Sequence, residues 1–246
     1  MISYHVNSPR PWWQCLGKPP VIAVFSFRYD SHLVSDLIEN ITPFVDGWVS
    51  YDDRQSGELF SNESKRRLIL IEEARKLGAR WILAIDPDER LESAAVNRFR
   101  ALTRWNRKVA WNFWLRELYE PNVYRVDGIW KWKRMPRLFP AFAPDPNAER
   151  GLHAHWFPDG AFKIRDTNIN LYHLKMISPS RRAGRRNLYK HLDPDHRYQA
   201  IGYDYLTDEA GAQFEAIPPR RHYLPPHTDD GKLWMGQLPF ARDSKC

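Results

Sequence analysis

The segment "ILAIDPDERL" carries two aspartates, Asp86 and Asp88, directly after a run of apolar residues. Carboxylates this close repel each other unless a cation or a basic side chain lies near them, and burial raises that cost. Two carboxylates separated by one residue can reach the same ion, and such hard oxygen ligands suit Mg²⁺ or Mn²⁺. An ion held by so few protein ligands keeps open positions, which substrate phosphates commonly fill. The competing interpretation of an isolated "DPDE" is a surface turn that caps the next helix.

The elements upstream of this acidic segment predict where it lies. Apolar runs at residues 21–27, 47–53 and 81–85 indicate buried strands, and residues 31–41 and 62–77 have the apolar spacing of helices. Alternating strands and helices predict a mostly parallel sheet with helices on both faces, and ligands bind such sheets at the carboxyl ends of the strands. We therefore expect one acidic edge, formed by Asp30, Asp52, Asp53, Asp86 and Asp88.

The rest of the chain is less regular. Beyond residue 92 we expect a helix at 93–102, a strand at 109–115, a hairpin around Asp127, strands at 151–157 and 167–175, and a basic helix at 178–192. The prolines and weak periodicity of residues 1–20 and 196–246 predict an N-terminal tail and a C-terminal extension that wrap the surface or are disordered. Residues 21–195 then form a single domain.

The composition limits the class of protein. The chain has 246 residues, 43% of them hydrophobic, and a net charge of +7, which fits a globular protein with anionic partners such as nucleic acids, membranes or phosphorylated small molecules. Two cysteines, Cys15 and Cys246, argue against a disulfide-stabilised secreted protein. The sequence has no recognisable signal peptide. Its apolar runs are shorter than the roughly 20 residues needed to span a bilayer. We expect a cytoplasmic protein, with peripheral contact at the inner face of the membrane as a further expectation.

Several ordered segments resemble one enzyme family. "DPDE" is similar to a DxD motif, "VIAVFSFRYDSHLVSDLIENITPFVDGWVSYDD" to a first strand, helix and second strand, and "NESKRRLILIEEARKLGARW" to an arginine-containing helix before the motif. Together they resemble family 2 glycosyltransferases, particularly the subgroup that acts in lipopolysaccharide and other cell-envelope glycan assembly. The resemblance covers residues 20–92 and extends loosely to residue 195 through "RLF", "LHAHW" and "YHLKMISPSRRAGRRNLY".

This resemblance implies a fold and an activity. The fold is α/β and GT-A-like, with a Rossmann-related, mostly parallel sheet flanked by helices and an irregular α+β C-terminal part. Residues 21–115 form the nucleotide-sugar-binding half, and residues 116–195 complete the metal site and bind the acceptor. The activity is hexosyl transfer, with inversion, from a UDP- or GDP-sugar to a glycan, lipid-linked or small-molecule hydroxyl, with Mn²⁺ or Mg²⁺ as cofactor. Nucleic acid is not an expected partner.

The resemblance also implies roles for individual residues. Nucleotide-sugar binding falls to Phe27, Asp52, Arg67, Asp86, Arg181 and Arg185. Arg181 and Arg185 belong to a basic cluster that could close over a diphosphate, the alternative being a solvated basic helix. Metal binding falls to Asp86, Asp88 and His173, and the acceptor side to His153 and His155.

The catalytic residues follow from the chemistry of inverting transfer. Asp88 would hold the metal that stabilises the leaving group, and a carboxylate base must deprotonate the acceptor hydroxyl. Related enzymes carry His-Glu where this chain has Ala154 in "LHAHW", so the base assignment departs from the family pattern. Glu149, which precedes the expected histidine strand, is our first candidate, and Asp127 and Asp145 are the others.

Two rival functions remain open at this stage. A Mg²⁺-dependent nuclease or phosphotransfer domain of the toprim type also delivers a DxD from an apolar strand, and it needs an acid after an earlier strand, which Asp30 could supply. A non-enzymatic nucleic-acid-binding protein could use the abundant Trp and Arg residues for stacking.

Overall fold

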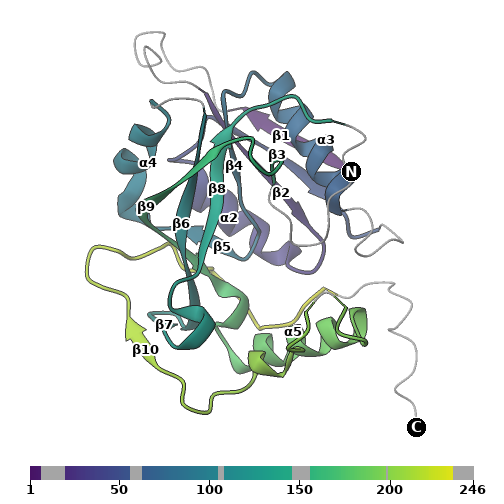
Figure 1. The fold of residues 1–246 in the computed structure, drawn as a ribbon, viewed down its shortest axis with the longest axis vertical. Coiled ribbons are helices and arrows are strands. Elements are labelled where there is room, and N and C mark those ends of the chain that lie inside the picture. Colours follow the sequence, from purple (N-terminus) through teal and green to yellow (C-terminus); the bar gives the residue numbers. More distant parts are fainter. Residues whose placement is uncertain (7–19, 56–62, 105–107, 146–155, 198, 235–246) are drawn as a thin grey trace.

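The computed structural model describes residues 1–6, 20–55, 63–104, 108–145, 156–197 and 199–234 (Figure 1). Its strands are β1 (Ile2–Val6), β2 (Val21–Phe27), β3 (Gly47–Asp52), β4 (Trp81–Ala84), β5 (Glu89–Leu91), β6 (Val109–Glu120), β7 (Val123–Arg125), β8 (Arg134–Pro140), β9 (Lys163–His173) and β10 (Phe214–Ala216). Its α-helices are α2 (Val34–Ile41), α3 (Glu63–Lys76), α4 (Val96–Leu102) and α5 (Pro179–Leu192). Short 3₁₀ turns are η1 (Ser31–Leu33), η2 (Ser93–Ala95), η3 (Gly128–Trp130), η4 (Leu174–Met176) and η5 (Asp204–Leu206).

Three parallel strands, in the order β3-β2-β4, form the part of the sheet that the sequence predicts. Side chains alternate between the two faces of a strand, and both faces of β2 are apolar. Val21, Ala23 and Phe25 pack in one core with α2 and α4, whereas Ile22 and Val24 pack in a second core with α3. Helices on both faces thus hold β2 at the centre of the molecule.

The sheet as a whole is mixed, with the order β1-β3-β2-β4-β8-β6-β7-β10 and with β9 joining β6 to β5. Parallel pairing joins β2 to β3 and β4, and β6 to β9; every other described pairing is antiparallel. The structure is therefore α/β with a mixed sheet, and the predicted mostly parallel sheet holds only for the β3-β2-β4 part. A parallel crossover needs about a dozen residues or more, so the short connection between β6 and β7 allows only antiparallel pairing of these two strands.

The less regular second half departs from the sequence expectations in detail. The strand expected at 109–115 continues to Glu120, and the tight turn of the hairpin follows it directly, ahead of Asp127. Asp127 instead precedes η3. Of the strand expected at 151–157, residues 151–155 lie outside the described residues. Ile2–Val6, assigned to a tail, pairs antiparallel with β3 as β1.

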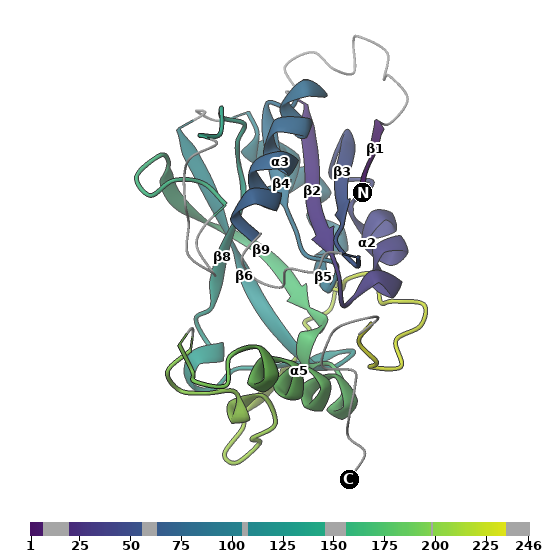
Figure 2. The ribbon, with the colours of Figure 1, turned by 90° about the vertical axis from the view of Figure 1, so that its right-hand side faces the viewer.

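Helix α5 lies across the ends toward which β2 and β9 run (Figure 2). The helix begins where Ser178 accepts a hydrogen bond from the backbone N–H of Arg181, with Pro179 at the first helical position. This position brings the basic face of α5 to the edge of the sheet at which the acidic residues were expected.

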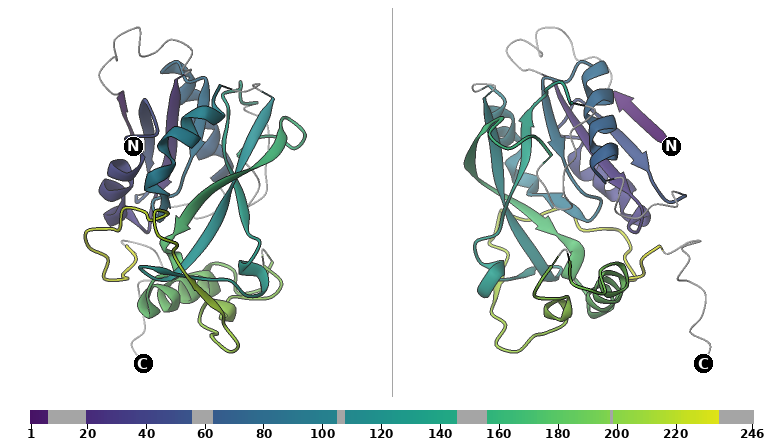
Figure 3. Two further views of the ribbon diagram at one scale, coloured as in Figure 1. Left: turned by 90° about the vertical axis from the view of Figure 1, so that its left-hand side faces the viewer. Right: turned by 45° about the vertical axis from the view of Figure 1, so that its right-hand side comes forward.

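The segment after β10 returns along the molecule to α2 (Figure 3). The N–H of Ser93 donates to the carbonyl of His222 at 2.9 Å, and the N–H of Trp234 donates to the carbonyl of Tyr29 at 2.8 Å. This part of the predicted C-terminal extension is therefore tied to the parallel strands. Within the described ranges, none of the helices combines the length and the apolar character needed to cross a bilayer.

Candidate functional site

A cavity of about 510 Å³ lies where β2 and β4 end, between these strands, β8, β9 and α5. Its walls carry residues of both charges. The acids include Asp30, Asp53, Asp86, Asp88 and Glu89, and the bases include Arg28, Arg66, Lys133, Arg137, His173, Lys175 and Arg185. The acidic edge expected from the sequence is thus present, and it faces an equally dense set of cations.

Asp88 is buried and surrounded by positive charge. Its Oδ2 lies 2.8 Å from Nη2 of Arg185 and 3.6 Å from Nη2 of Arg181, and its Oδ1 lies 3.4 Å from Nε2 of His173. Burial alone would raise the pKa of Asp88, but the charges of His173 and Arg181 outweigh it and hold the pKa well below its usual range. Asp88 is an ionised carboxylate at neutral pH.

Asp86 points to another part of the same cavity and is 44% exposed. Its Oδ2 lies 2.6 Å from Nη2 of Arg137, while its backbone N–H donates to Glu89 at 3.0 Å. Arg137 also pairs with Glu89, whose pKa is raised to about 7 by burial against the attraction of Arg137. Asp86 and Asp88 therefore have different partners, one accessible and one enclosed.

His173 lies between two carboxylates at the end of β9. The register places it opposite Glu89 of β5 and opposite Glu117 of β6. Its Nδ1 lies 2.9 Å from Oε2 of Glu117, an ion pair at an angle unfavourable for a hydrogen bond, and Glu117 also pairs with Lys133 at 2.6 Å. Burial would lower the pKa of His173, but Glu117 and Asp88 raise it to about 10.

The two arginines predicted to cover the donor are both buried. Arg181 and Arg185 are one helical turn apart on α5 and point to the same side. Nη2 of Arg181 donates to Asp30 at 3.0 Å, and Nη2 of Arg185 contacts both Asp30 and Asp88. Of these two arginines only Arg185 lines the cavity. The alternative of a solvated basic helix does not describe this face of α5.

Two of the predicted nucleotide-binding residues are not among those that line the cavity. Asp52 pairs with Arg54 at 2.7 Å and does not line the cavity, whereas the next residue, Asp53, does. Arg67 likewise stacks on Trp156, with its guanidinium carbon 5.0 Å from the ring centroid. Phe27 lines the cavity as predicted.

Of the predicted base and acceptor residues, the structure describes Asp127 and Asp145. Asp127 pairs with Arg125 at 2.7 Å, and this hydrogen bond lowers the pKa of Asp127. Neither Asp127 nor the exposed Asp145 lines the cavity. The remaining candidates, Glu149, His153 and His155, lie outside the described residues.

The sequence reasoning missed several cavity residues, notably Arg28, Arg66, Lys133, Arg137 and Lys175, and it missed Glu117, which contacts the cavity residue His173. Most of them lie next to a residue that was chosen or within a segment that carried the resemblance. Arg66 precedes Arg67, and Arg137 is the first residue of "RLF". Glu117 gave no signal, because its partner His173 lies 56 residues further along the chain.

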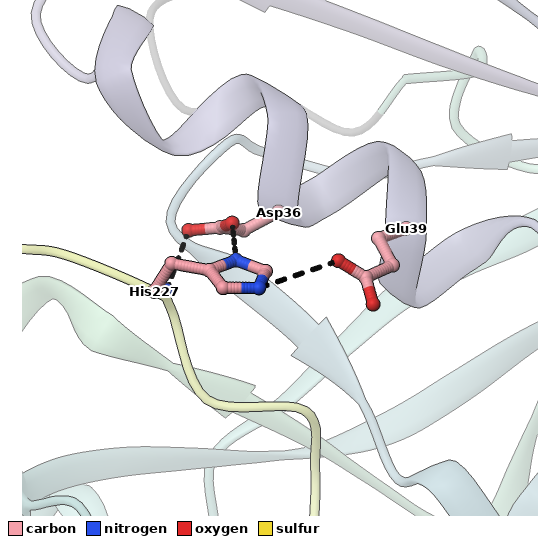
Figure 4. A group of neighbouring side chains, drawn as sticks. All are labelled: Asp36, Glu39 and His227. Atoms are coloured by element: carbon pink, nitrogen blue, oxygen red, sulfur yellow. Dashed lines mark hydrogen bonds and ion pairs between the residues drawn. The ribbon is translucent and has the colours of Figure 1, made fainter.

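A second group of potential metal ligands lies outside the cavity (Figure 4). Asp36, Glu39 and His227 form the group of described residues whose three ligand atoms lie within 4.8 Å of one another. Nδ1 of His227 is 2.5 Å from Asp36, and its Nε2 is 3.9 Å from Glu39. The hydrogen bond to Asp36 raises the pKa of His227. These contacts tie the C-terminal segment to α2, a role that the sequence did not predict.

No family model matches this sequence, and no curated protein is significantly similar to it. The α/β class with a mixed sheet hosts many activities, so function has to be argued from the chemistry of the cavity.

Proposed function

We propose that this protein is a metal-dependent glycosyltransferase with a GT-A-like fold, which transfers a hexose from a UDP- or GDP-sugar to a hydroxyl acceptor in envelope glycan assembly. The observation that carries the proposal is the cavity at the ends of β2 and β4, which Asp86, Asp88 and His173 all line among several cations, with Asp88 next to His173 and Asp86 apart from them. The acids suit a divalent ion, and the bases suit the phosphates of a nucleotide.

Asp88 and His173 are the predicted ligands that lie close enough together to share a divalent cation. Oδ1 of Asp88 and Nε2 of His173 lie 3.4 Å apart, so one ion could contact both if it displaces the proton that the raised pKa of His173 keeps on the ring at neutral pH. Glu117 occupies the other nitrogen of His173 at 2.9 Å, an arrangement of carboxylate and histidine that recurs beside protein metal sites. Asp86 supplies a more exposed carboxylate on the same cavity. When bound, such an ion neutralises charge that develops on the leaving nucleoside diphosphate.

The cavity also suits the rest of a nucleotide sugar. Its volume of about 510 Å³ falls within the roughly 300–1,000 Å³ typical of small-molecule sites. Arg137, Lys175 and Arg185 line it and can bind phosphate oxygens, and Phe27 and Tyr29 offer rings for stacking. Because Arg125 holds Asp127 away from the cavity, Glu149 is retained as the proposed base.

The experiment measures the melting temperature with UDP, GDP and the corresponding nucleotide sugars, with and without Mn²⁺. A ligand that binds only the native state raises the melting temperature. We expect a rise that needs both nucleotide and Mn²⁺, and we expect Asp88→Asn to lose it. Asp195→Asn, which changes an exposed carboxylate paired with Arg197, is the matched control. Shifts that are absent throughout, or equal in both variants, would contradict the proposal.

One observation favours a second candidate, a Mg²⁺-dependent phosphotransfer domain. Asp30 and Asp88 follow different strands and share Nη2 of Arg185, so two acids from separate strands meet, as the toprim-type alternative requires. Cleavage of DNA that needs Mg²⁺ and is lost in Asp30→Asn, together with no response to nucleotide sugars, would favour this candidate.

A further inference from the structure

A row of alternating rings and cations runs along β6 and the start of β8. The guanidinium carbon of Arg116 lies 4.8 Å from the ring centroids of both Trp114 and Tyr124, and that of Arg134 lies 3.9 Å from Trp114. Trp114 and Trp132 are 5.9 Å apart, and Nζ of Lys131 is 5.5 Å from the ring of Trp132. Rings held against cations in this way keep an apolar surface and a positive charge in one place.

This row lies on the face of the strands that is turned away from the cavity. Leu115, Lys133 and Met135 line the cavity, and successive side chains of a strand point to opposite faces. Trp114 and Arg134, which are direct partners in the β6–β8 pairing, therefore face outward. The row is a separate surface and makes no use of the proposed transferase site.

The end of the row beside η3 is strongly exposed. Trp132 is 69% exposed and Ile129 is 60% exposed, whereas Trp130 between them is buried. Ile129 lies in η3 and Trp132 in the turn that follows directly, so the two exposed side chains flank Trp130, whose burial anchors this part of the chain. Single exposed apolar residues are common, but two on one turn, beside lysine, mark an interaction surface.

The charge of this turn identifies the chemistry of its partner. Within the part of the chain that the structure describes, Lys131 and Arg116 have no carboxylate partner, and the whole chain carries a net charge of +7. Arg134 alone among the cations of the row pairs with an acid, Asp166. Amphipathic rings, exposed aliphatic side chains and unneutralised cations together match the boundary between anionic headgroups and acyl chains. We propose that Ile129, Lys131 and Trp132 dock this protein on an anionic lipid bilayer.

The test is co-sedimentation of the full chain with lipid vesicles at low salt. Vesicles are made of phosphatidylcholine alone or of phosphatidylcholine mixed with phosphatidylglycerol. We expect retention by the mixed vesicles, weak retention by the neutral ones, and release as salt is added. The double variant Ile129→Ser/Trp132→Ser and the single variant Lys131→Glu should each lose affinity about tenfold or more.

The matched control is Tyr4→Ser, which removes a 67% exposed ring from β1, at the end of the molecule opposite β7 (Figures 1 and 2). Circular dichroism melting curves verify that each variant is folded, and Lys131→Glu provides the test if the double variant is not. The proposal is overturned if the wild type is not retained, if neutral vesicles retain it equally well, or if the variants bind like the control. It is also overturned if the double variant is retained by vesicles like the wild type but loses another interaction of the wild type. That interaction could be dimerisation or binding to a soluble acidic polysaccharide.

Discussion

Arg185 of α5 lies with its Nη2 2.8 Å from Oδ2 of Asp88, 97 residues earlier in the chain. The same nitrogen contacts Asp30, so one guanidinium lies between two acids that follow different strands. A buried carboxylate needs a cation close to it, and here α5 supplies that cation. The contact therefore joins the C-terminal half of the fold to the acidic edge of the parallel strands.

Replacing Arg185 by glutamine should destabilise the protein by about 3 kcal/mol, because the two buried carboxylates of Asp30 and Asp88 would lose a shared cation and keep Arg181 as their common guanidinium partner. Chemical denaturation monitored by circular dichroism measures the change in the free energy of unfolding. Arg186→Gln is the matched control on the next residue, since Arg186 bonds only Thr207 and its neighbour Asn187 among the described contacts. Equal effects of the two substitutions would show that the Asp30–Arg185–Asp88 contact adds nothing to stability.

The strand that follows the acidic segment, β5, pairs with β9 and is also bound by the side-chain amide of Asn40. Nδ2 of Asn40 donates to the carbonyl of Leu91 at 3.1 Å, and the N–H of Leu91 donates to Oδ1 of Asn40 at 2.8 Å. Asn40→Ala leaves both buried backbone groups of β5 unpaired, which should cost about 3 kcal/mol. The exposed Asn187→Ala is the control, and its expected effect is within about 0.5 kcal/mol. If Asn40→Ala lowers the free energy of unfolding no more than the control does, water replaces the side-chain amide as the partner of Leu91.

The C-terminal segment should loosen in acid because of Asp229. This carboxylate lies 3.2 Å from Nη1 of Arg181 and 3.2 Å from Nε2 of His32. Burial would raise the pKa of Asp229, but the hydrogen bond to His32 and the charge of Arg181 lower it. A group whose pKa is lowered by folding stabilises the native state above its ordinary pKa, and that contribution is lost as the pH falls through the folded-state pKa.

Asp229→Asn should therefore be less stable than the wild type at neutral pH by about 1 kcal/mol, and the difference should shrink below the ordinary pKa of 3.8. Thermal unfolding across the acid range measures it. Asp230→Asn, at an exposed neighbouring carboxylate, is the control and should have little effect. A difference that stays constant from neutral pH down to strong acid would rule out titration of Asp229 as the cause.

The sequence predicted the parallel core because its signals there are local. Apolar runs such as Val21–Phe27 end at polar residues, and Asp86 and Asp88 come directly after the next such run. Strand ends in a parallel sheet meet at one edge, so Asp88 and Asp30 could be expected together from the chain order alone. The basic helix after His173 was likewise visible, as α5 confirms.

The rest depends on pairings between distant segments, which no local pattern reveals. The insertion of β8 between β4 and β6 makes the sheet mixed, and "RMPRLFP", with its two prolines, gives no hint of that central position. Glu117 lies beyond the strand expected at 109–115, and its importance becomes visible only when β9 brings His173 opposite it. Asp52 and Arg67 were each one residue away from the cavity-lining Asp53 and Arg66. One residue changes the face of a strand at Asp52, and it turns the side chain around the axis of helix α3 at Arg67.

Glu117 provides the sharpest test of the proposed metal site, because it touches His173 without being one of the proposed ligands. It holds Nδ1 of His173 at 2.9 Å, which turns Nε2 toward Asp88. Loss of such a supporting carboxylate typically lowers metal affinity about 10–100-fold, so we expect Glu117→Gln to weaken Mn²⁺ binding in the presence of UDP or GDP by that factor. Isothermal titration calorimetry measures the affinity without requiring an acceptor. Glu120→Gln, at the exposed end of the same strand, should bind Mn²⁺ like the wild type. If both variants keep wild-type affinity, His173 is not a metal ligand and its contact with Glu117 serves stability alone.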